Sequence, residues 1–187
     1  MDNVKFAKNK DLTNSINQKY IALLLKHHEA ISNSFDIGRS QNTAHDIQLK
    51  KQDSIYFKQF RIPKAQREAV QKHIEELLKL GVVIPSRSKF NNPIYVVSRP
   101  DRGLQVEHDF WVINQETLLE PYSMQNLQDS MEDLSRAGSK LFSKIDLTSG
   151  FWQMFLNLEC RKYIVFTLPG VGQFKWITSS ARLIGAP

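Results

Sequence analysis

The sequence has a single cysteine and no long apolar run, and each shortage excludes a class of protein. Cys160 is the one cysteine among 187 residues, which excludes an intrachain disulfide and a zinc site built from several thiolates. No stretch approaches the roughly 18 uninterrupted apolar residues of a membrane span, and the first ten residues lack the apolar core of a signal peptide. We therefore expect an intracellular protein, cytoplasmic or nuclear, with no membrane partner.

The charge that is present gathers in one part of the chain. Hydrophobic residues make up 41% and charged residues 24%, which is typical of a folded globular protein. Residues 58–102 contain ten Lys and Arg against four Asp and Glu, so their excess equals the whole formal net charge of +6. A local basic excess suits contacts with a nucleic-acid backbone, although a solvated basic surface has the same composition.

Two helices are predicted in the first half of the chain. The first covers residues 13–31, where apolar positions such as Tyr20 and Leu23 recur at the spacing of one buried face. Residues 32–59 are polar and predict an extended connector that lies across another surface. The second helix runs from Pro63 to Gly81, because proline suits a first helical turn and glycine a helix end.

Beyond Gly81 the pattern changes from helical to extended. A helix is predicted at residues 123–136, and the remaining apolar runs are short and rich in β-branched and aromatic residues. Helices and antiparallel strands therefore alternate irregularly, which predicts an α+β fold. The predicted strands are residues 82–84, 94–97, 104–106, 141–146, 153–158, 164–168 and 174–177.

Asp146 is the first candidate for chemistry. It ends a predicted hydrophobic strand and is followed by Thr-Ser-Gly, which turns the chain. A carboxylate in such a position suits Mg²⁺, and nucleotidyl transfer by two metal ions needs carboxylates of this kind. Taken by itself, an Asp before Thr-Ser-Gly is more often a turn or cap residue than a metal ligand.

Three blocks of sequence together resemble one family. FSKIDLTSGFWQM at residues 142–154 closely resembles the first catalytic motif of reverse transcriptases from gypsy-class LTR retrotransposons. The segments RIPKAQREAVQKHIEELLKLGVVIPSRSKFNNPIYVV at residues 61–97 and YIVFTLPGVGQFKWITS at residues 163–179 are similar to the same family. The blocks follow the family's order and spacing, and the resemblance covers about residues 20–187.

The resemblance implies a partial right-hand polymerase, with fingers and the first part of the palm in residues 60–187 and a linker in residues 1–59. Its partners would be an RNA template, a DNA primer and deoxynucleoside triphosphates, with Mg²⁺ as cofactor. Asp146 would be the first metal-binding carboxylate, and the Leu147 carbonyl a further metal ligand. Phe151 would lie beneath the incoming sugar and exclude a 2′-hydroxyl, ordinary core packing being the alternative. The cations expected at nucleic acid are Lys89, Arg99 and Arg102.

The sequence departs from the family's pattern at positions that the family uses for nucleotide binding. The family has Gly-Leu-Arg-x-x-x-Asp-Phe-Arg-x-Leu-Asn where residues 103–114 have Gln105 and Trp111 in place of both arginines. The first arginine would grip the nucleotide's triphosphate, and an amide cannot reproduce its charged, bidentate contact. We expect the indole of Trp111 to be a bulky replacement in a packed setting, or alternatively a stacking platform for a base. Arg182 stands where the family has a glycine, ahead of Leu-Ile-Gly-Ala-Pro.

The family's Tyr-x-Asp-Asp hairpin, which supplies the other catalytic carboxylates, is absent from the 187 residues. The resemblance therefore leads us to expect a site that these residues do not complete, with the rest of the polymerase polyprotein missing. Three hypotheses remain open. The chain is a polymerase piece that is inactive alone, a nucleic-acid-binding remnant without catalysis, or a decayed retroelement product with no selected function.

Overall fold

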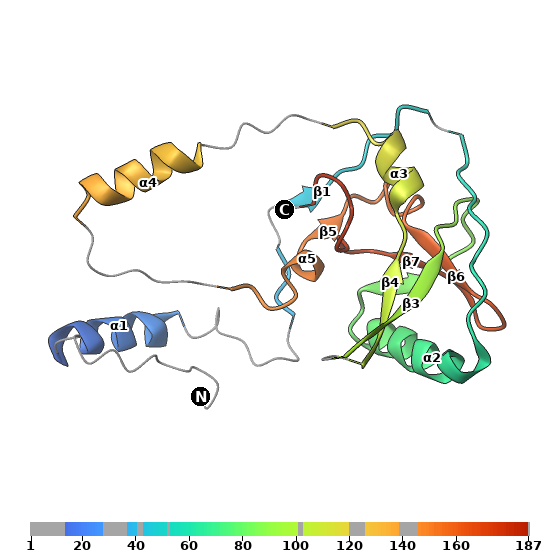
Figure 1. The fold of residues 1–187 in the computed structure, drawn as a ribbon, viewed down its shortest axis with the longest axis horizontal. Helices are drawn as coiled ribbons and strands as arrows, with labels where there is room; N and C mark the ends of the chain where they lie inside the picture. Colours follow the sequence, from blue (N-terminus) through green and yellow to red (C-terminus); the bar gives the residue numbers. More distant parts are fainter. Residues whose placement is uncertain are drawn as a thin grey trace. The chain divides into compact units, whose positions relative to one another are not determined.

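The computed structural model describes residues 14–27, 37–40, 43–51, 53–100, 103–119, 126–138 and 146–186 (Figure 1). The chain forms two compact units, Met1–Arg39 and Ser40–Pro187. Within the described residues, no helix has the length and apolar character needed to cross a membrane.

The first unit contains helix α1 (Asn14–Lys26). The predicted helix is therefore confirmed in its described part, but it ends at Lys26, while Thr13 and residues 28–31 lie outside the described residues. The predicted buried face is wrong, because the side chains of Tyr20 and Leu23 are exposed. The three-four spacing reports amphipathic character, and it does not ensure that another element covers the apolar side.

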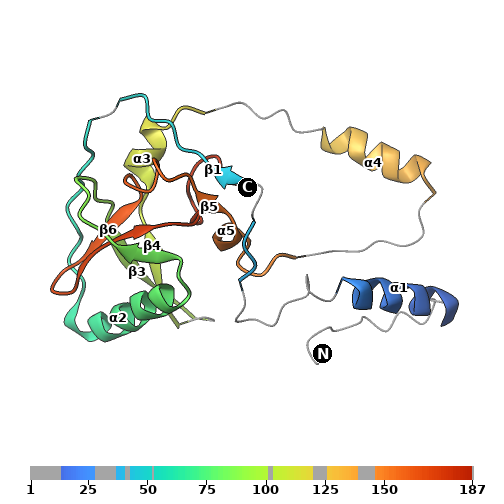
Figure 2. The same ribbon diagram turned by 180° about the vertical axis from the view of Figure 1, so that it is seen from behind.

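The second unit is a mixture of short strands and helices, as predicted for an α+β fold (Figures 1 and 2). Strands β2, β7 and β6 form an antiparallel sheet in that order, β3 and β4 form an antiparallel hairpin, and β1 pairs with β5 in parallel. The elements in chain order are β1 (Ala44–His45), α2 (Lys64–Lys79), β2 (Val83–Pro85), β3 (Ile94–Arg99), β4 (Gly103–His108), α3 (Trp111–Glu116), α4 (Leu127–Arg136), α5 (Gly150–Gln153), β5 (Phe155–Leu156), β6 (Val165–Leu168) and β7 (Gly172–Trp176).

Helix α2 confirms the predicted second helix. Pro63 is its N-cap, and Gly81 follows the C-cap with a φ of +62°, a conformation that glycine adopts without a Cβ clash. The buried stripe is Val70, Ile74 and Leu77, and the helix packs on β4 and β2 (Figure 2). Complete burial of each such side chain stabilises the fold by about 1.5–3 kcal/mol. Because α2 packs on both β4 and β2, these side chains join the hairpin to the three-stranded sheet.

An aromatic cluster around His108 forms the centre of the second unit. The His108 ring centroid lies 4.7 Å from that of Phe166, 5.1 Å from that of Trp176 and 5.7 Å from that of Phe110. His108 is buried, and neither of its ring nitrogens has a hydrogen-bond partner within the described part of the chain. Burial lowers the pKa of His108 to about 3, with His73 adding to the effect, so the imidazole is neutral in the fold.

The segment before α2 lies across the second unit in extended form, as predicted for the connector. Strand β1 pairs with β5, Leu49 bridges to Thr117, and the backbone of residue 56 bridges to that of Asn91. Ile47 is buried in this segment. The predicted boundary between residues 59 and 60 remains a prediction, although the structure groups residues from Ser40 onward with the second unit.

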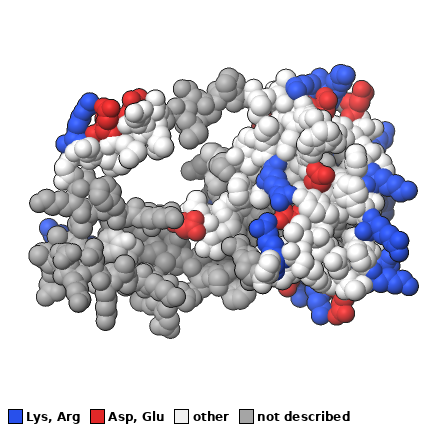
Figure 3. Space-filling model, viewed as in Figure 1, with Lys and Arg blue, Asp and Glu red and all other residues white. Residues whose placement is uncertain are grey.

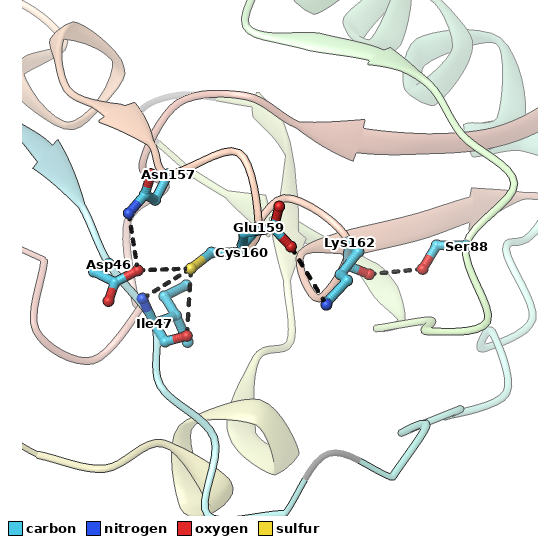
Figure 4. Close-up of polar contacts among 7 residues, drawn as sticks. All are labelled: Asp46, Ile47, Ser88, Asn157, Glu159, Cys160 and Lys162. Carbon is cyan, nitrogen blue, oxygen red and sulfur yellow. Dashed lines mark hydrogen bonds and ion pairs between the residues drawn. The ribbon is translucent and has the colours of Figure 1, made fainter.

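Cys160 anchors the same segment through polar contacts around its buried thiol (Figure 4). The Ile47 N–H donates to Cys160 Sγ at 3.2 Å, and the thiol lies 2.9 Å from Asp46 Oδ1, to which it donates. Burial, followed by the Asp46 hydrogen bond, raises the pKa of Cys160 to about 11, and that same bond is the largest cause of the lowered pKa of Asp46. The thiol is therefore protonated and structural rather than reactive.

Several predicted boundaries differ from the structure. Residues 141–145 of a predicted strand lie outside the described residues, and Asp146 is not in a strand. The predicted strand 153–158 is reduced to β5, because Gln153 belongs to α5. Helix α4 begins at Leu127, where the Gln128 N–H donates to the side chain of the N-cap Asn126 at 2.9 Å. The short helix α3 was not predicted.

Candidate nucleic-acid and nucleotide site

The β3–β4 hairpin places several site residues on one face. Tyr95 pairs with Glu107, Val97 with Gln105 and Arg99 with Gly103. Because side chains at alternate positions of a strand share a face, Tyr95 and Arg99 lie on the same side as Gln105 and Glu107. The sequence-predicted residues Arg99 and Gln105 are therefore brought together by register.

Glu107 joins this hairpin face to the C-terminal loop. Its carboxylate lies 3.3 Å from Arg99 Nη2 and forms a second ion pair with Arg182. The Glu107 side chain is 13% exposed, whereas those of the two arginines are about half exposed. Arg182 also donates to the Tyr95 hydroxyl. Two guanidinium groups around one carboxylate leave a net charge of +1 on this face.

The backbone at Arg182 explains why glycine suits this position. Its φ is +76°, in the left-handed region, where a residue with a Cβ is strained by roughly 1–2 kcal/mol. The side-chain amide of Asn114 donates to the Arg182 carbonyl at 2.7 Å and accepts from the Ile184 N–H at 3.0 Å. Asn114, at the end of the family's pattern, thus fixes the loop that carries Arg182.

His45 holds the same C-terminal loop from the other direction, a role that the sequence did not suggest. His45 Nδ1 lies 3.1 Å from Ser179 Oγ, and a Cβ added to Gly185 would lie 3.5 Å from His45 Nε2. Burial lowers the pKa of His45, against smaller raising effects of a backbone hydrogen bond with Ile184 and of the Asp46 charge. The ring is therefore mainly neutral near pH 7.

The turn that follows Asp146 is shaped by local contacts. Ser149 has a φ of +51°, and a Cβ added to Gly150 would lie 3.2 Å from Leu147 Cβ, so glycine is favoured there. Helix α5 carries Phe151, which is 38% exposed, and Gln153 Nε2 donates to the Thr148 carbonyl at 2.9 Å. The partial exposure of Phe151 argues against simple core packing.

Asp146 and Leu147 are both exposed, and no hydrogen bond or ion pair within the described residues joins Asp146 to the hairpin. Among those residues, no group of three or more His, Cys, Asp or Glu side chains is placed to hold a metal ion. One carboxylate and one carbonyl do not fit a pair of Mg²⁺ ions, which needs several carboxylates between them. The described residues therefore supply part of such a site at most.

The remaining candidates lie at the surface. Lys89 is exposed, and its neighbour Ser88 donates through Oγ to the Lys162 carbonyl at 2.7 Å (Figure 4). Arg102 lies outside the described residues. Trp111 is 62% exposed, so the predicted packed setting for its indole is wrong. The helix that begins at Trp111 turns the side chain outward, and a stacking role for it stays a prediction.

Similarity to known proteins agrees with the resemblance in sequence. No family model matches the chain. The enzymatic polyprotein of Figwort mosaic virus (strain DxS) is 37% identical over 125 residues, covering 65% of this chain and 18% of that protein. The retrovirus-related Pol polyprotein from transposon opus of Drosophila melanogaster is 32% identical over 135 residues, covering 69% of this chain and 13% of that protein. The chain thus spans less than a fifth of the length of these relatives.

Solved structures give the fold. The crystal structure of prototype foamy virus protease-reverse transcriptase, as a CSH mutant, has a TM-score of 0.73 at 22% identity, covering 95% of this chain and 24% of that one. The foamy viral protease-reverse transcriptase in complex with RNA/DNA hybrid has a TM-score of 0.72 at 24% identity, with the same coverage. The fold is therefore that of part of a reverse transcriptase polymerase domain. Together with the Pol and enzymatic polyproteins among its relatives, it confirms that the chain resembles a retroelement RNA-directed DNA polymerase.

Proposed function

We propose that the chain forms the fingers and the first part of the palm of a reverse transcriptase from a gypsy-class LTR retroelement. Residues 60–187 would belong to the polymerase and residues 1–59 to a preceding linker. The similarity to the opus polyprotein and the three motif blocks in family order support this origin. Its action would be intracellular, in the cytoplasm or the nucleus, where the buried Cys160 thiol stays reduced.

In this function the chain holds an RNA template and a DNA primer. The observation that carries the proposal is the hairpin face on which Arg99 and Arg182 surround one carboxylate, Glu107. Its net positive charge suits phosphate, and the basic residues 58–102 include strand β3 of this hairpin. The foamy viral enzyme with a similar fold has been solved with RNA/DNA hybrid, which supports nucleic acid as the partner.

We further propose the family's roles for the residues of the Asp146 turn. Asp146 and the Leu147 carbonyl would be metal ligands, and Phe151 would lie under the sugar of the incoming deoxynucleoside triphosphate. When bound, Mg²⁺ would neutralise phosphate charge during nucleotidyl transfer. Gln105 would contact the triphosphate through an amide, which lacks the charge and the fork geometry of arginine. We therefore expect the 187-residue chain to bind nucleic acid without extending a primer.

Binding is tested by fluorescence anisotropy of a labelled RNA–DNA hybrid. We expect affinity that falls steeply with salt, and a slope of log K against log salt that decreases by about 1 in Arg99→Gln and in Arg182→Gln. Arg136→Gln is the matched control, because Arg136 pairs with Glu132 at 3.1 Å in α4 and should leave the slope unchanged. Affinity that does not depend on salt would refute the proposal.

Catalysis is tested by primer extension with Mg²⁺ and the four deoxynucleoside triphosphates. We expect no extension by the purified 187-residue chain, whose described residues offer Asp146 as a single carboxylate at the turn. Sustained extension that is lost in Asp146→Asn would show that the chain is an enzyme as it stands. Extension that persists in Asp146→Asn would point to a contaminating polymerase.

A further inference from the structure

Two arginines from distant parts of the chain meet at the β3–β4 hairpin. Arg99 ends β3 and Arg182 lies in the C-terminal loop, yet both form ion pairs with the carboxylate of Glu107 in β4. The guanidinium of Arg182 also lies 5.9 Å from the centre of the Tyr95 ring, a cation–π contact, and it donates to the hydroxyl of that residue. We call Arg99 and Arg182 the arginine pair.

The register of the hairpin places the arginine pair beside Gln105. Arg99 is opposite Gly103, and Glu107 lies four residues further along β4, which is roughly 13 Å along the strand. Because the side chains of Arg99 and Glu107 meet at 3.3 Å, they extend towards each other on the same face, across position 105. The positive charge that an arginine would bring to this position is therefore supplied by side chains from β3 and from the C-terminal loop.

The loop that carries Arg182 is held in place by long-range hydrogen bonds. The Asn114 side-chain amide donates to the Arg182 carbonyl at 2.7 Å, and the Ser179 N–H donates to the Met154 carbonyl at 2.7 Å. The second bond joins the loop to the end of α5, the helix that carries Phe151. The guanidinium is thus carried on a preorganised backbone, which reduces the ordering cost of binding.

The arginine pair remains accessible although it is ion-paired. The side chains of Arg99 and Arg182 are 47% and 48% exposed, whereas that of Glu107 is 13% exposed. A guanidinium has five N–H donors in a planar fork, so each arginine keeps donors for a further anion after it has met the carboxylate. The arginine pair can therefore bind an anion without first releasing Glu107.

Two guanidinium groups that converge on one carboxylate suit a compact polyanion. The phosphates of a nucleic-acid backbone are spaced along the strand with one charge each, whereas a triphosphate concentrates several charges and many acceptor oxygens in one short chain. Arginine forks contact such oxygens in pairs, which a single ammonium cannot do. Figure 3 shows further Lys and Arg side chains along the outer edge of the second unit, and a basic surface of this kind attracts anions to the molecule.

We propose that Arg182, together with Arg99, binds the triphosphate of a deoxynucleoside triphosphate. Arg182 then supplies, from the C-terminal loop, the cation that β4 lacks at Gln105. The assignment rests on the proposed function in taking a nucleotide as substrate. It goes beyond that function by naming a phosphate-binding residue at a position where the family has glycine, so the resemblance in sequence does not imply it.

The test measures nucleotide binding by the full 187-residue chain, with deoxyadenosine triphosphate that carries a methylanthraniloyl fluorophore as the probe. Titrations are made in EDTA, so that protein cations alone meet the phosphates. We expect Arg182→Gly and Arg99→Gln each to weaken binding about tenfold to a hundredfold, because each loses a charge-assisted contact. Unlabelled deoxyadenosine triphosphate and tripolyphosphate should displace the probe, whereas deoxyadenosine monophosphate should displace it far less well.

A rescue variant separates a phosphate contact from a structural role. Gln105→Arg combined with Arg182→Gly returns the guanidinium to β4 and should restore most of the affinity that Arg182→Gly loses. Arg182→Lys keeps the charge without the fork, and should bind about threefold to tenfold more weakly than the natural chain. Arg136→Gln is the matched control, because Arg136 forms an exposed ion pair with Glu132 in α4 and should leave the affinity unchanged. Where circular dichroism shows Arg182→Gly to be unfolded, Arg182→Lys decides in its place.

Each outcome bears on one proposal. The assignment is overturned if the natural chain does not bind the probe, if Arg182→Gly binds it as tightly, or if Gln105→Arg brings no rescue. Equal displacement by the monophosphate also overturns it, because the chain of phosphates would not be what is recognised. Hybrid binding that depends on Arg182 without any triphosphate binding would leave the proposed template–primer function standing. Triphosphate binding through Arg182, in a chain whose hybrid affinity does not depend on salt, would overturn that function and leave this inference standing.

Discussion

The β3–β4 hairpin and the Asp146 turn carry the two halves of the proposed function, and the chain holds them in different ways. The hairpin is paired along its whole length, and Glu107 ties it to Arg182, far away in sequence. Asn114 fixes the backbone on which Arg182 lies. Asp146, in contrast, is exposed, and its turn is shaped by contacts within a few residues. Long-range contacts thus support the binding surface, whereas within the described residues no hydrogen bond or ion pair holds the carboxylate of Asp146.

The largest expected effect is a loss of stability in acid, caused by His108 at the end of the β3–β4 hairpin. Its pKa is about 3 in the fold against an ordinary value of 6.5, so the unfolded chain takes up the proton first as the pH falls. Stability is fully present above pH 6.5 and is lost as the pH falls from there towards 3. We expect a loss on the order of 3 kcal/mol at about pH 4.5, measured by urea unfolding followed by tryptophan fluorescence.

His108→Leu is the variant that tests this assignment. It removes the titrating ring and keeps an apolar side chain in the aromatic cluster, so most of the pH dependence should disappear. His45 and His73, whose pKa values are also lowered mainly by burial, should leave a smaller dependence of the same sign. An unchanged pH profile in His108→Leu would show that other groups carry the acid sensitivity.

The second effect concerns the Asn114 side chain, which holds the C-terminal loop to α3 through hydrogen bonds. Asn114→Ala removes two hydrogen bonds, to the Arg182 carbonyl and from the Ile184 N–H. We expect a loss of about 2 kcal/mol in the free energy of unfolding, since each bond contributes about 1 kcal/mol. Asn157→Ala, which removes one exposed 3.3 Å bond to Asp46, should cost less than about 0.5 kcal/mol. Equal losses of stability in the two variants would mean that Asn114 holds the C-terminal loop no more firmly than an exposed hydrogen bond does.

Local signals explain which parts of this fold could be predicted from sequence. Helix α2 and the β3–β4 hairpin have a clear period and flanking proline or glycine, so their positions were predicted to within about two residues. Strand β1 has two residues and α5 has four, too few to show any period. Their conformation depends on pairing and packing with distant segments, which one sequence does not display.

The features of the site also divide into those that the sequence could identify and those that it could not. Gln105, Trp111 and Arg182 were identified because the family's pattern shows what they replace. The ion pair of Arg182 with Glu107 and the contact of His45 with Ser179 were not, because residues far apart in the chain form them. Exposure was also misjudged at Trp111, since sequence pattern does not show which way a short helix turns its side chains.

A smaller effect tests the left-handed backbone conformation of Arg182. Its φ of +76° should make Arg182→Gly about 1 kcal/mol more stable than Arg182→Ala, because both lose the guanidinium but alanine keeps the strained backbone. At ordinary helix or strand positions the order is reversed, with glycine less stable. Thermal and urea unfolding of the two variants give the difference directly, and alanine as the more stable variant would contradict a left-handed conformation.

The smallest effect is expected at Asp146. Asp146→Asn keeps the shape of the side chain and removes a charge that has no hydrogen bond or ion pair within the described residues. The free energy of unfolding should therefore change by less than about 0.5 kcal/mol. A loss above about 1 kcal/mol would mean that the folded chain holds this carboxylate in place, and the contrast with the hairpin would fail. A negligible change joined to unchanged hybrid affinity would show that this chain binds without using the carboxylate assigned to chemistry.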